Sequence, residues 1–130
     1  MLSGRIFSVD NAHAVQPNYA DKQYDQHSQR LGDRSVIKFN CNQCYATDSG
    51  GAAPLRLLAE RAEAGLQVFV MRADLACGSM IGPTTATATG IATTGLGVPT
   101  LAMHSTRGLA YTADTPQLVS LLTAFYRRLA

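Results

Sequence analysis

Short apolar, strand-like runs alternate with amphipathic, helix-like segments along the chain, and this alternation constrains the fold more than any other feature. The last helix-like segment is the clearest, because Leu118, Leu121, Leu122 and Phe125 fall on one helical stripe. Strands that alternate with helices predict an α/β fold in which helices cover a sheet. We expect strands at residues 5–9, 35–40, 66–71, 91–96 and 100–103, and helices at about 53–64, 80–89 and 116–129.

Local signals predict where these elements begin and end. Pro54 suits the first turn of the first helix, after a turn at residues 48–51, and Gly65 is expected to end that helix. Thr115 is expected to cap the last helix. Residues 16–34 are polar and predict a long loop, of the kind that often carries function.

Composition narrows the classes of function. With 46% hydrophobic residues, 130 residues suffice for one domain with its own core. The net charge is only +2 and the basic residues are scattered, which argues against a nucleic-acid partner. No apolar run reaches ~18 residues, so no membrane partner is expected. Three cysteines, an odd number, favour a reducing compartment, and we therefore expect a cytoplasmic protein.

Two residues that can bind metal, Asp10 and His104, each follow a predicted strand although they lie far apart in the sequence. In open α/β sheets, ligands usually bind at the carboxyl ends of strands. Carboxylate and imidazole are both common zinc ligands. Spacing alone leaves another interpretation open, in which Asp10 caps a turn with Asn11 and His104 is a half-buried, hydrogen-bonded histidine.

Several motifs in a fixed order make the metal interpretation more specific. They are Ser8-x-Asp10-x-Ala12-His13-Ala14, Pro17-Asn-Tyr19, Val36-Ile-Lys38, Tyr45-Ala-Thr47, Asp74-x-x-Cys77-Gly-Ser-x-Ile81-Gly-Pro83 and Leu101-Ala-Met-His104-Ser105. Together they run from Ser8 to about Arg107 without a large gap. In this order the motifs resemble the aspartyl aminopeptidase family of zinc metallopeptidases.

The resemblance implies a three-layer metallo-aminopeptidase fold, of which residues 1–130 would be a C-terminal segment of the catalytic domain. It implies two zinc ions, one bound by Asp10 and the other by His104. It further implies a homo-oligomer that removes N-terminal, acidic residues from peptide substrates. Lys38 and Tyr45 resemble residues that line the substrate pocket, where an ammonium and a hydroxyl suit a carboxylate. The residues alone also allow a Lys38 that points to solvent and a Tyr45 that fills the edge of the core.

The chain also departs from the family pattern. The family has a histidine at the position of Gln16 and a carboxylate at that of Gly95. The resemblance implies that His13 supports a metal ligand or contacts another subunit, and does not itself bind metal. The family takes its general base from an upstream glutamate, whereas Glu60 and Glu63 lie on a predicted helix far from either ligand. We therefore expect no catalytic residue in this chain and no activity from it alone.

The alternative function is a non-catalytic remnant that binds a partner or co-assembles with an intact subunit.

Cys41 and Cys44 form a lone CxxC motif, whose spacing suits a redox pair or half of a zinc site. The motif ends a predicted strand, whereas a redox pair normally stands at a helix N-terminus. Two small packing residues are the competing interpretation. We expect both thiols to be reduced and free of structural metal, and a thiol-redox or metal-binding module is the third functional hypothesis.

Overall fold

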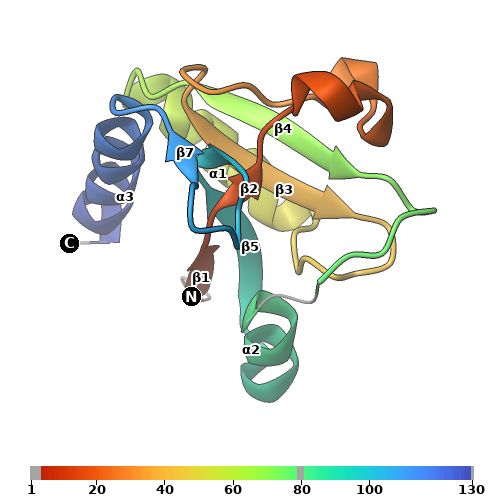
Figure 1. The fold of residues 1–130 in the computed structure, drawn as a ribbon. Coiled ribbons are helices and arrows are strands. Elements are labelled where there is room, and N and C mark those ends of the chain that lie inside the picture. The colour runs from red at the N-terminus through yellow and green to blue at the C-terminus, as the bar shows by residue number, and fades with distance from the viewer. Residues whose placement is uncertain (1–3, 79–80, 130) are drawn as a thin grey trace.

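The structure, a computed structural model, describes residues 4–78 and 81–129, and a mixed four-stranded sheet forms its centre (Figure 1). The strands are β1 (Arg5–Val9), β3 (Ser35–Asn40), β4 (Leu66–Met71) and β5 (Ala92–Gly97), in the order β1-β5-β3-β4. β1 is parallel to β5 and β3 is parallel to β4, whereas β3 and β5 are antiparallel. The strands expected at 5–9, 35–40 and 66–71 are confirmed, and the one expected at 91–96 lies one residue later.

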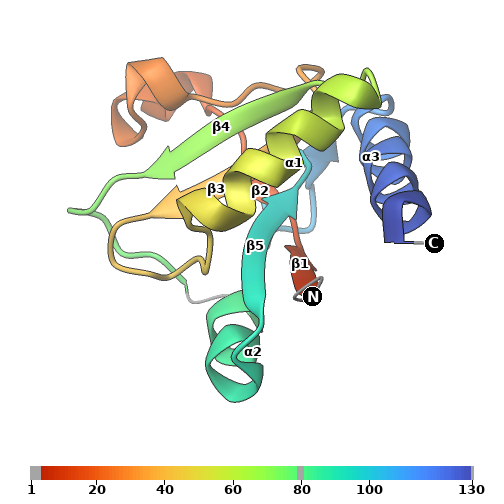
Figure 2. The same cartoon turned by 180° about the vertical axis from the view of Figure 1, so that it is seen from behind.

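Three α-helices pack around this sheet: α1 (Ser49–Arg61), α2 (Ile81–Thr89) and α3 (Asp114–Leu129). Figure 2 shows α1 in front of the sheet, and α1 and α3 share a buried apolar cluster with the strands. α2 packs instead against β5 and β1. The expected α/β architecture is thus confirmed. Among the described residues, no helix is both long enough and apolar enough to cross a membrane.

Alternation along β3 divides the interior into two clusters. Ile37 is fully buried in the cluster formed with α1 and α3. Val36 belongs to a second cluster that includes Tyr45 and Phe69. Successive side chains of a strand point to opposite faces, so Lys38 shares the face of Val36. Lys38 is therefore directed to the face of the sheet that carries the second cluster, opposite the cluster that α1 and α3 share.

A second, smaller sheet continues the first. It contains β2 (Ala12–His13), β6 (Pro99–Leu101) and β7 (Leu109–Ala110), in the order β2-β6-β7. The backbone amides of Asp10, Ala12 and Ala14 donate to carbonyls of residues 96, 98 and 100 at 2.8–3.0 Å. The chain after β1 therefore stays paired with the chain after β5, which fixes the position of Asp10.

Helix α1 begins at Ser49, earlier than expected, and the turn predicted at residues 48–51 is its first turn. The Asp48 carboxylate caps it by accepting from the Gly51 amide at 2.7 Å. Pro54, which was expected in the first turn, lies further inside the helix and has no N–H to donate to the Gly50 carbonyl. The Arg5 guanidinium donates to that carbonyl instead, at 2.7 Å, so the proline is accommodated.

The other boundaries differ in smaller ways. α1 ends at Arg61 and the chain turns at Glu63, whose φ is +51°, so Gly65 is not the terminator. α3 begins at Asp114, so Thr115, the expected cap, lies inside the helix, and the helix starts before the expected Pro116. The strand expected at 100–103 ends at Leu101. The predicted loop 16–34 contains two short 3₁₀ helices, η1 (Pro17–Lys22) and η2 (Asp25–His27). The helix expected at 80–89 is confirmed from Ile81, while residue 80 lies outside the described residues.

Candidate metal and substrate site

One cavity of about 280 Å³ brings together all four residues that the sequence singled out. Asp10 follows β1, Lys38 lies on β3, Tyr45 lies between β3 and α1, and His104 lies in the turn after β6. Segments from both ends of the sequence therefore meet at one site. The roles of the four side chains in binding metal or substrate stay predictions.

Asp10 is held in place by its own backbone and by the close approach of Gly97. Its amide donates to the Leu96 carbonyl at 3.0 Å, and one carboxylate oxygen accepts from the Asn11 amide at 2.7 Å. A β-carbon on Gly97 would lie 1.6 Å from the Asp10 carbonyl oxygen, so only glycine fits there. The turn-capping role of Asp10 is thus present, and it engages only one of the two carboxylate oxygens.

Lys38 is buried, so the alternative that it points to solvent is wrong. Its side chain is 1% exposed, and Nζ donates to the Asp10 carbonyl at 3.2 Å and to the Asn11 carbonyl at 3.0 Å. Burial lowers the Lys38 pKa to about 8, while the Asp10 carboxylate opposes that shift. At neutral pH the cavity wall therefore carries a positive charge attached to the segment that holds Asp10.

Tyr45 belongs both to the core and to the cavity wall. It packs against Phe69 with ring centroids 6.2 Å apart, and Lys38 Nζ lies 5.4 Å from the centre of its ring. Burial, followed by a hydrogen bond with Cys77, raises the pKa of the Tyr45 hydroxyl. The hydroxyl is therefore protonated at neutral pH and able to donate a hydrogen bond. The core interpretation therefore describes Tyr45, while its role in binding substrate stays a prediction.

His104 stands in an unusual backbone conformation. Its φ is +68° and that of Ala102 is +52°, and the Ser105 amide donates to the Ala102 carbonyl at 3.0 Å to close the turn. Left-handed conformations of residues other than glycine are uncommon and concentrate at functional sites. This turn ends β6 early and presents His104 at the cavity.

His13 and Cys77 also line the cavity, although the sequence gave neither a direct role at the site. Burial, followed by the positive field of His104 and Lys38, lowers the His13 pKa, and Asp10 partly offsets this. His13 is therefore neutral at pH 7. The only sequence signal for these two residues was their membership of the motifs around Asp10 and Pro83.

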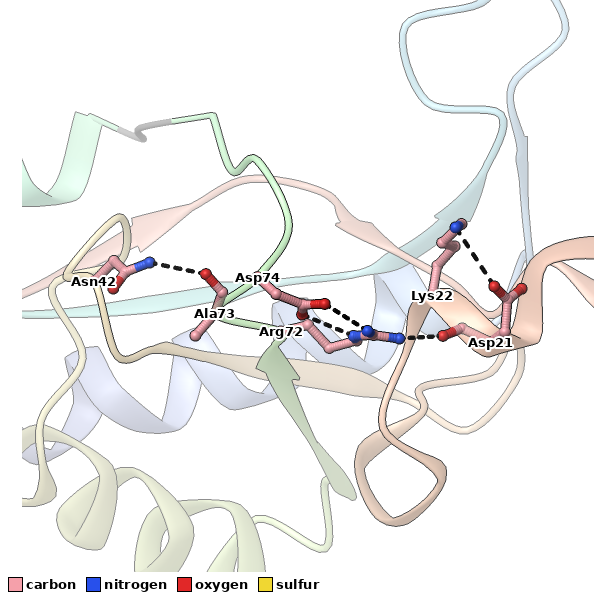
Figure 3. Close-up of polar contacts among 6 residues, drawn as sticks. All are labelled: Asp21, Lys22, Asn42, Arg72, Ala73 and Asp74. Atoms are coloured by element: carbon pink, nitrogen blue, oxygen red, sulfur yellow. Dashed lines mark hydrogen bonds and ion pairs between the residues drawn. The ribbon is translucent and has the colours of Figure 1, made fainter.

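The loop between β4 and α2 forms part of the cavity wall and is anchored by Arg72 (Figure 3). Arg72 binds both carboxylate oxygens of Asp74, at 2.9 and 2.6 Å, and also donates to the Asp21 carbonyl of η1. Asn42 donates to the Ala73 carbonyl at 3.3 Å. Hydrogen bonds from Arg72 lower the Asp74 pKa. These contacts hold the segment that carries Cys77 beside the cavity.

The donor set fits zinc in type but not in number. A catalytic zinc normally has three protein ligands and one water. Asp10 and His104 supply a carboxylate and an imidazole, but the described residues contain no group of three His, Cys, Asp or Glu side chains able to hold a metal ion. Glu60 and Glu63 line a different pocket, beside Arg34 and Gly65. These residues would therefore supply part of a metal site rather than the whole of it.

Comparison with known proteins agrees with the fold and the motif order. The profile of the family described as aminopeptidase I zinc metalloprotease (M18) matches residues 2–126. A protein named probable M18 family aminopeptidase 2 from Ectopseudomonas mendocina (strain ymp) is 51% identical over 121 residues, which are 93% of this chain and 28% of that protein. Its namesake from Azotobacter vinelandii is 48% identical over 126 residues, or 97% of this chain and 29% of that one.

Solved structures give the same result. A chain in the cryo-EM structure of the Ape4 and Nbr1 complex matches with a TM-score of 0.95 and 39% identity, over all of this chain and 25% of that one. A chain of the S. cerevisiae mApe1 dodecamer matches with a TM-score of 0.84 and 28% identity, over 95% of this chain and 26% of that one.

These findings define an α/β chain with the architecture of part of a metallo-aminopeptidase. The chain belongs to the M18 family of aminopeptidases, and the resemblance inferred from the motifs is confirmed. It spans about a quarter of the length of the relatives that it matches.

Proposed function

We propose that this chain contributes one wall of a two-zinc aminopeptidase site. The observation that carries the proposal is the convergence of Asp10, Lys38, Tyr45 and His104 on one cavity, although they come from four separate segments. Asp10 would bind one ion and His104 the other. Zinc in such a site polarises the scissile carbonyl and lowers the pKa of a bound water. Further ligands and the general base would come from groups outside the described wall.

The same wall suits a peptide with an acidic first residue. The Lys38 ammonium supplies positive charge at the cavity, and the protonated Tyr45 hydroxyl supplies a hydrogen-bond donor. Charge-assisted hydrogen bonds of this kind are stronger than neutral ones. Binding of an N-terminal Asp peptide should therefore exceed that of the matching Asn peptide, and Lys38→Met should remove the difference. Equal binding of both peptides would contradict an acidic preference.

Zinc binding tests the proposed ligands without requiring activity. The metal-free chain is titrated with zinc against a chromogenic indicator, together with Asp10→Asn and His104→Asn. Asparagine tolerates the left-handed backbone of residue 104, so the second variant changes the ligand rather than the turn. We expect each variant to bind zinc about tenfold more weakly, since a ligand or its charge is lost. The exposed Cys41 provides the control, Cys41→Ser.

The outcomes separate two kinds of site. Loss of zinc in Asp10→Asn and His104→Asn, with Cys41→Ser unchanged, supports the proposed site. Loss of zinc only in Cys41→Ser supports the thiol module and contradicts the proposal.

The second candidate function is a non-catalytic subunit that co-assembles with an intact relative. It is favoured by the lack, within the described residues, of any group of three metal donors. One solved relative is described as a dodecamer, so we also propose self-association for this chain.

The non-catalytic role is tested by the release of N-terminal Asp from a short chromogenic peptide with zinc present. We expect no turnover from the chain alone, whereas robust turnover that His104→Asn abolishes would refute the non-catalytic role.

A further inference from the structure

Two cysteines from distant segments lie close together, and one of them lines the cavity. Cys44 lies in the turn after β3, and Cys77 lies in the loop that precedes α2. The Cys44 sulfur lies 3.9 Å from the Cys77 carbonyl oxygen, which it faces as a donor. Cys77 itself is partly buried, packs against the cluster of Val36, Tyr45 and Phe69, and lines the cavity.

The structure favours this pair over the CxxC pair of the sequence. Cys41 is exposed, whereas Cys44 and Cys77 are each only partly exposed. Among the described residues, the Cys44 sulfur contacts the backbone carbonyl of Cys77 and makes no hydrogen bond with Cys41. The Cys44 amide also donates to Asn40 Oδ1 at 3.3 Å, which anchors Cys44 next to the end of β3. Burial raises the Cys44 pKa, and the nearby Cys77 adds to that rise.

We propose that Cys44 and Cys77 are an oxidisable pair whose disulfide cross-links two loops at the cavity wall. The oxidant is a peroxide. One thiolate attacks a peroxide oxygen, the O–O bond breaks, and a sulfenic acid and one water form. The second thiol then displaces hydroxide from that sulfenic sulfur, so that an S–S bond and a second water result. Each sulfur loses one electron and one proton overall, and the peroxide is reduced to two waters.

The cross-link changes the cavity directly. Cys77 contributes its thiol to the cavity wall, where it packs against the cluster that includes Tyr45. A disulfide removes that thiol proton and ties the loop after β3 to the loop that Arg72 anchors. The oxidised chain should therefore bind a cavity ligand differently from the reduced chain. This inference does not depend on whether zinc occupies the site.

Peptide mapping of the wild-type chain tests the proposal without any variant. The reduced chain is treated with hydrogen peroxide, the remaining thiols are alkylated, and the digest is analysed by mass spectrometry. We expect a cross-linked peptide pair that contains Cys44 and Cys77, with Cys41 as the one alkylated thiol of the three. A Cys41–Cys44 cross-link, a link between two chains, or three alkylated thiols would each overturn the proposal.

Matched variants sharpen the result. Cys41→Ser should form the cross-link at the wild-type rate, whereas Cys44→Ser and Cys77→Ser should not form it. Far-UV circular dichroism checks that each variant is folded. An intramolecular cross-link that persists in Cys44→Ser would show that another thiol is the partner and would refute the assigned pair.

Discussion

At the scale of single residues, the position of Asp10 depends on a glycine that has no chemistry of its own. A β-carbon on Gly97 would lie 1.6 Å from the Asp10 carbonyl oxygen, which is a backbone atom and has little freedom to move. That carbonyl is also an acceptor for Lys38 Nζ. The glycine, the aspartate and the lysine therefore form one unit, and a change at residue 97 acts on the other two.

Gly97→Ala should destabilise the chain and displace Asp10. We expect a loss of about 1–3 kcal/mol in the free energy of unfolding, as for other overpacked interiors, and weaker zinc binding. Urea unfolding and the zinc titration measure the two effects. Gly108→Ala is the control, because a β-carbon there has no neighbour closer than 3.9 Å. Equal stability of the two variants would show that residues 10 and 97 move apart without cost.

Lys38 should make stability depend on pH. Its pKa is about 8 in the fold and 10.5 in the unfolded reference. Between these values the unfolded chain binds more protons than the folded one, so stability should rise from about pH 8 to about pH 10.5, by up to about 3 kcal/mol. Below pH 8 both states are protonated and this contribution is constant. Urea unfolding in metal-free buffer across this range is the measurement.

The comparison that isolates Lys38 uses the chain's two lysines. Lys38→Met should lose the alkaline rise, whereas Lys22→Met should keep it, because Lys22 is exposed. If both variants keep the same slope as the wild type, the buried ammonium is not its source.

The sequence predicted which residues meet at the cavity but not how they are held. Asp10, Lys38, Tyr45 and His104 stand in motifs whose order identifies the family, so they were identified without coordinates. The left-handed φ of His104 and the bonds from Lys38 to two carbonyls depend on tertiary packing that no local pattern encodes. The approach of the Cys44 sulfur to the Cys77 carbonyl is tertiary in the same way.

At the scale of elements, one carboxylate joins α3 to the entrance of β3. Asp114 is 1% exposed, and its two oxygens accept from the amides of Gly32 at 2.9 Å and Arg34 at 3.1 Å. Those amides belong to a turn in which Gly32 and Arg34 both have positive φ, at +84° and +77°. The first turn of α3 therefore organises the loop that leads into the central strand.

Asp114→Ala should cost about 2–4 kcal/mol in the free energy of unfolding, because it leaves two amides without their acceptor. Asp114→Asn retains one acceptor oxygen and should cost less. Asp33→Ala provides a control in the same loop, since Asp33 is exposed. Thermal and urea unfolding give the ranking, and a loss for Asp33→Ala as large as that for Asp114→Ala would contradict this role.

The elements that the sequence missed are short or depend on a partner. β2 and β7 have two residues each, too few for a periodic pattern to appear. The early start of α1 depends on the Asp48 cap, and its tolerance of Pro54 depends on a guanidinium from β1, which is distant in sequence. By contrast, the strands with continuous apolar runs and the strongly amphipathic α3 were predicted because local pattern and tertiary packing agree.

At the scale of the whole molecule, the central sheet ends in two outer strands, β1 and β4. Outer strands offer unpaired amides and carbonyls to another chain unless they are covered or charged. β1 carries Val9, which is 46% exposed, at the end next to Asp10. β4 is partly protected, since η2 packs against it. Self-association of this chain should therefore proceed through β1.

Val9→Lys should weaken that self-association, because a charge on an outer strand opposes edge-to-edge pairing. We expect the dissociation constant from sedimentation velocity, over a range of protein concentrations, to rise on the order of tenfold, equivalent to about 1.4 kcal/mol. Val119→Lys is the matched control, since Val119 is similarly exposed, at 56%, but lies on α3. Circular dichroism verifies that both variants fold. If Val119→Lys dissociates the assembly while Val9→Lys leaves it intact, the contact lies on the face of α3 and not on the edge of the sheet.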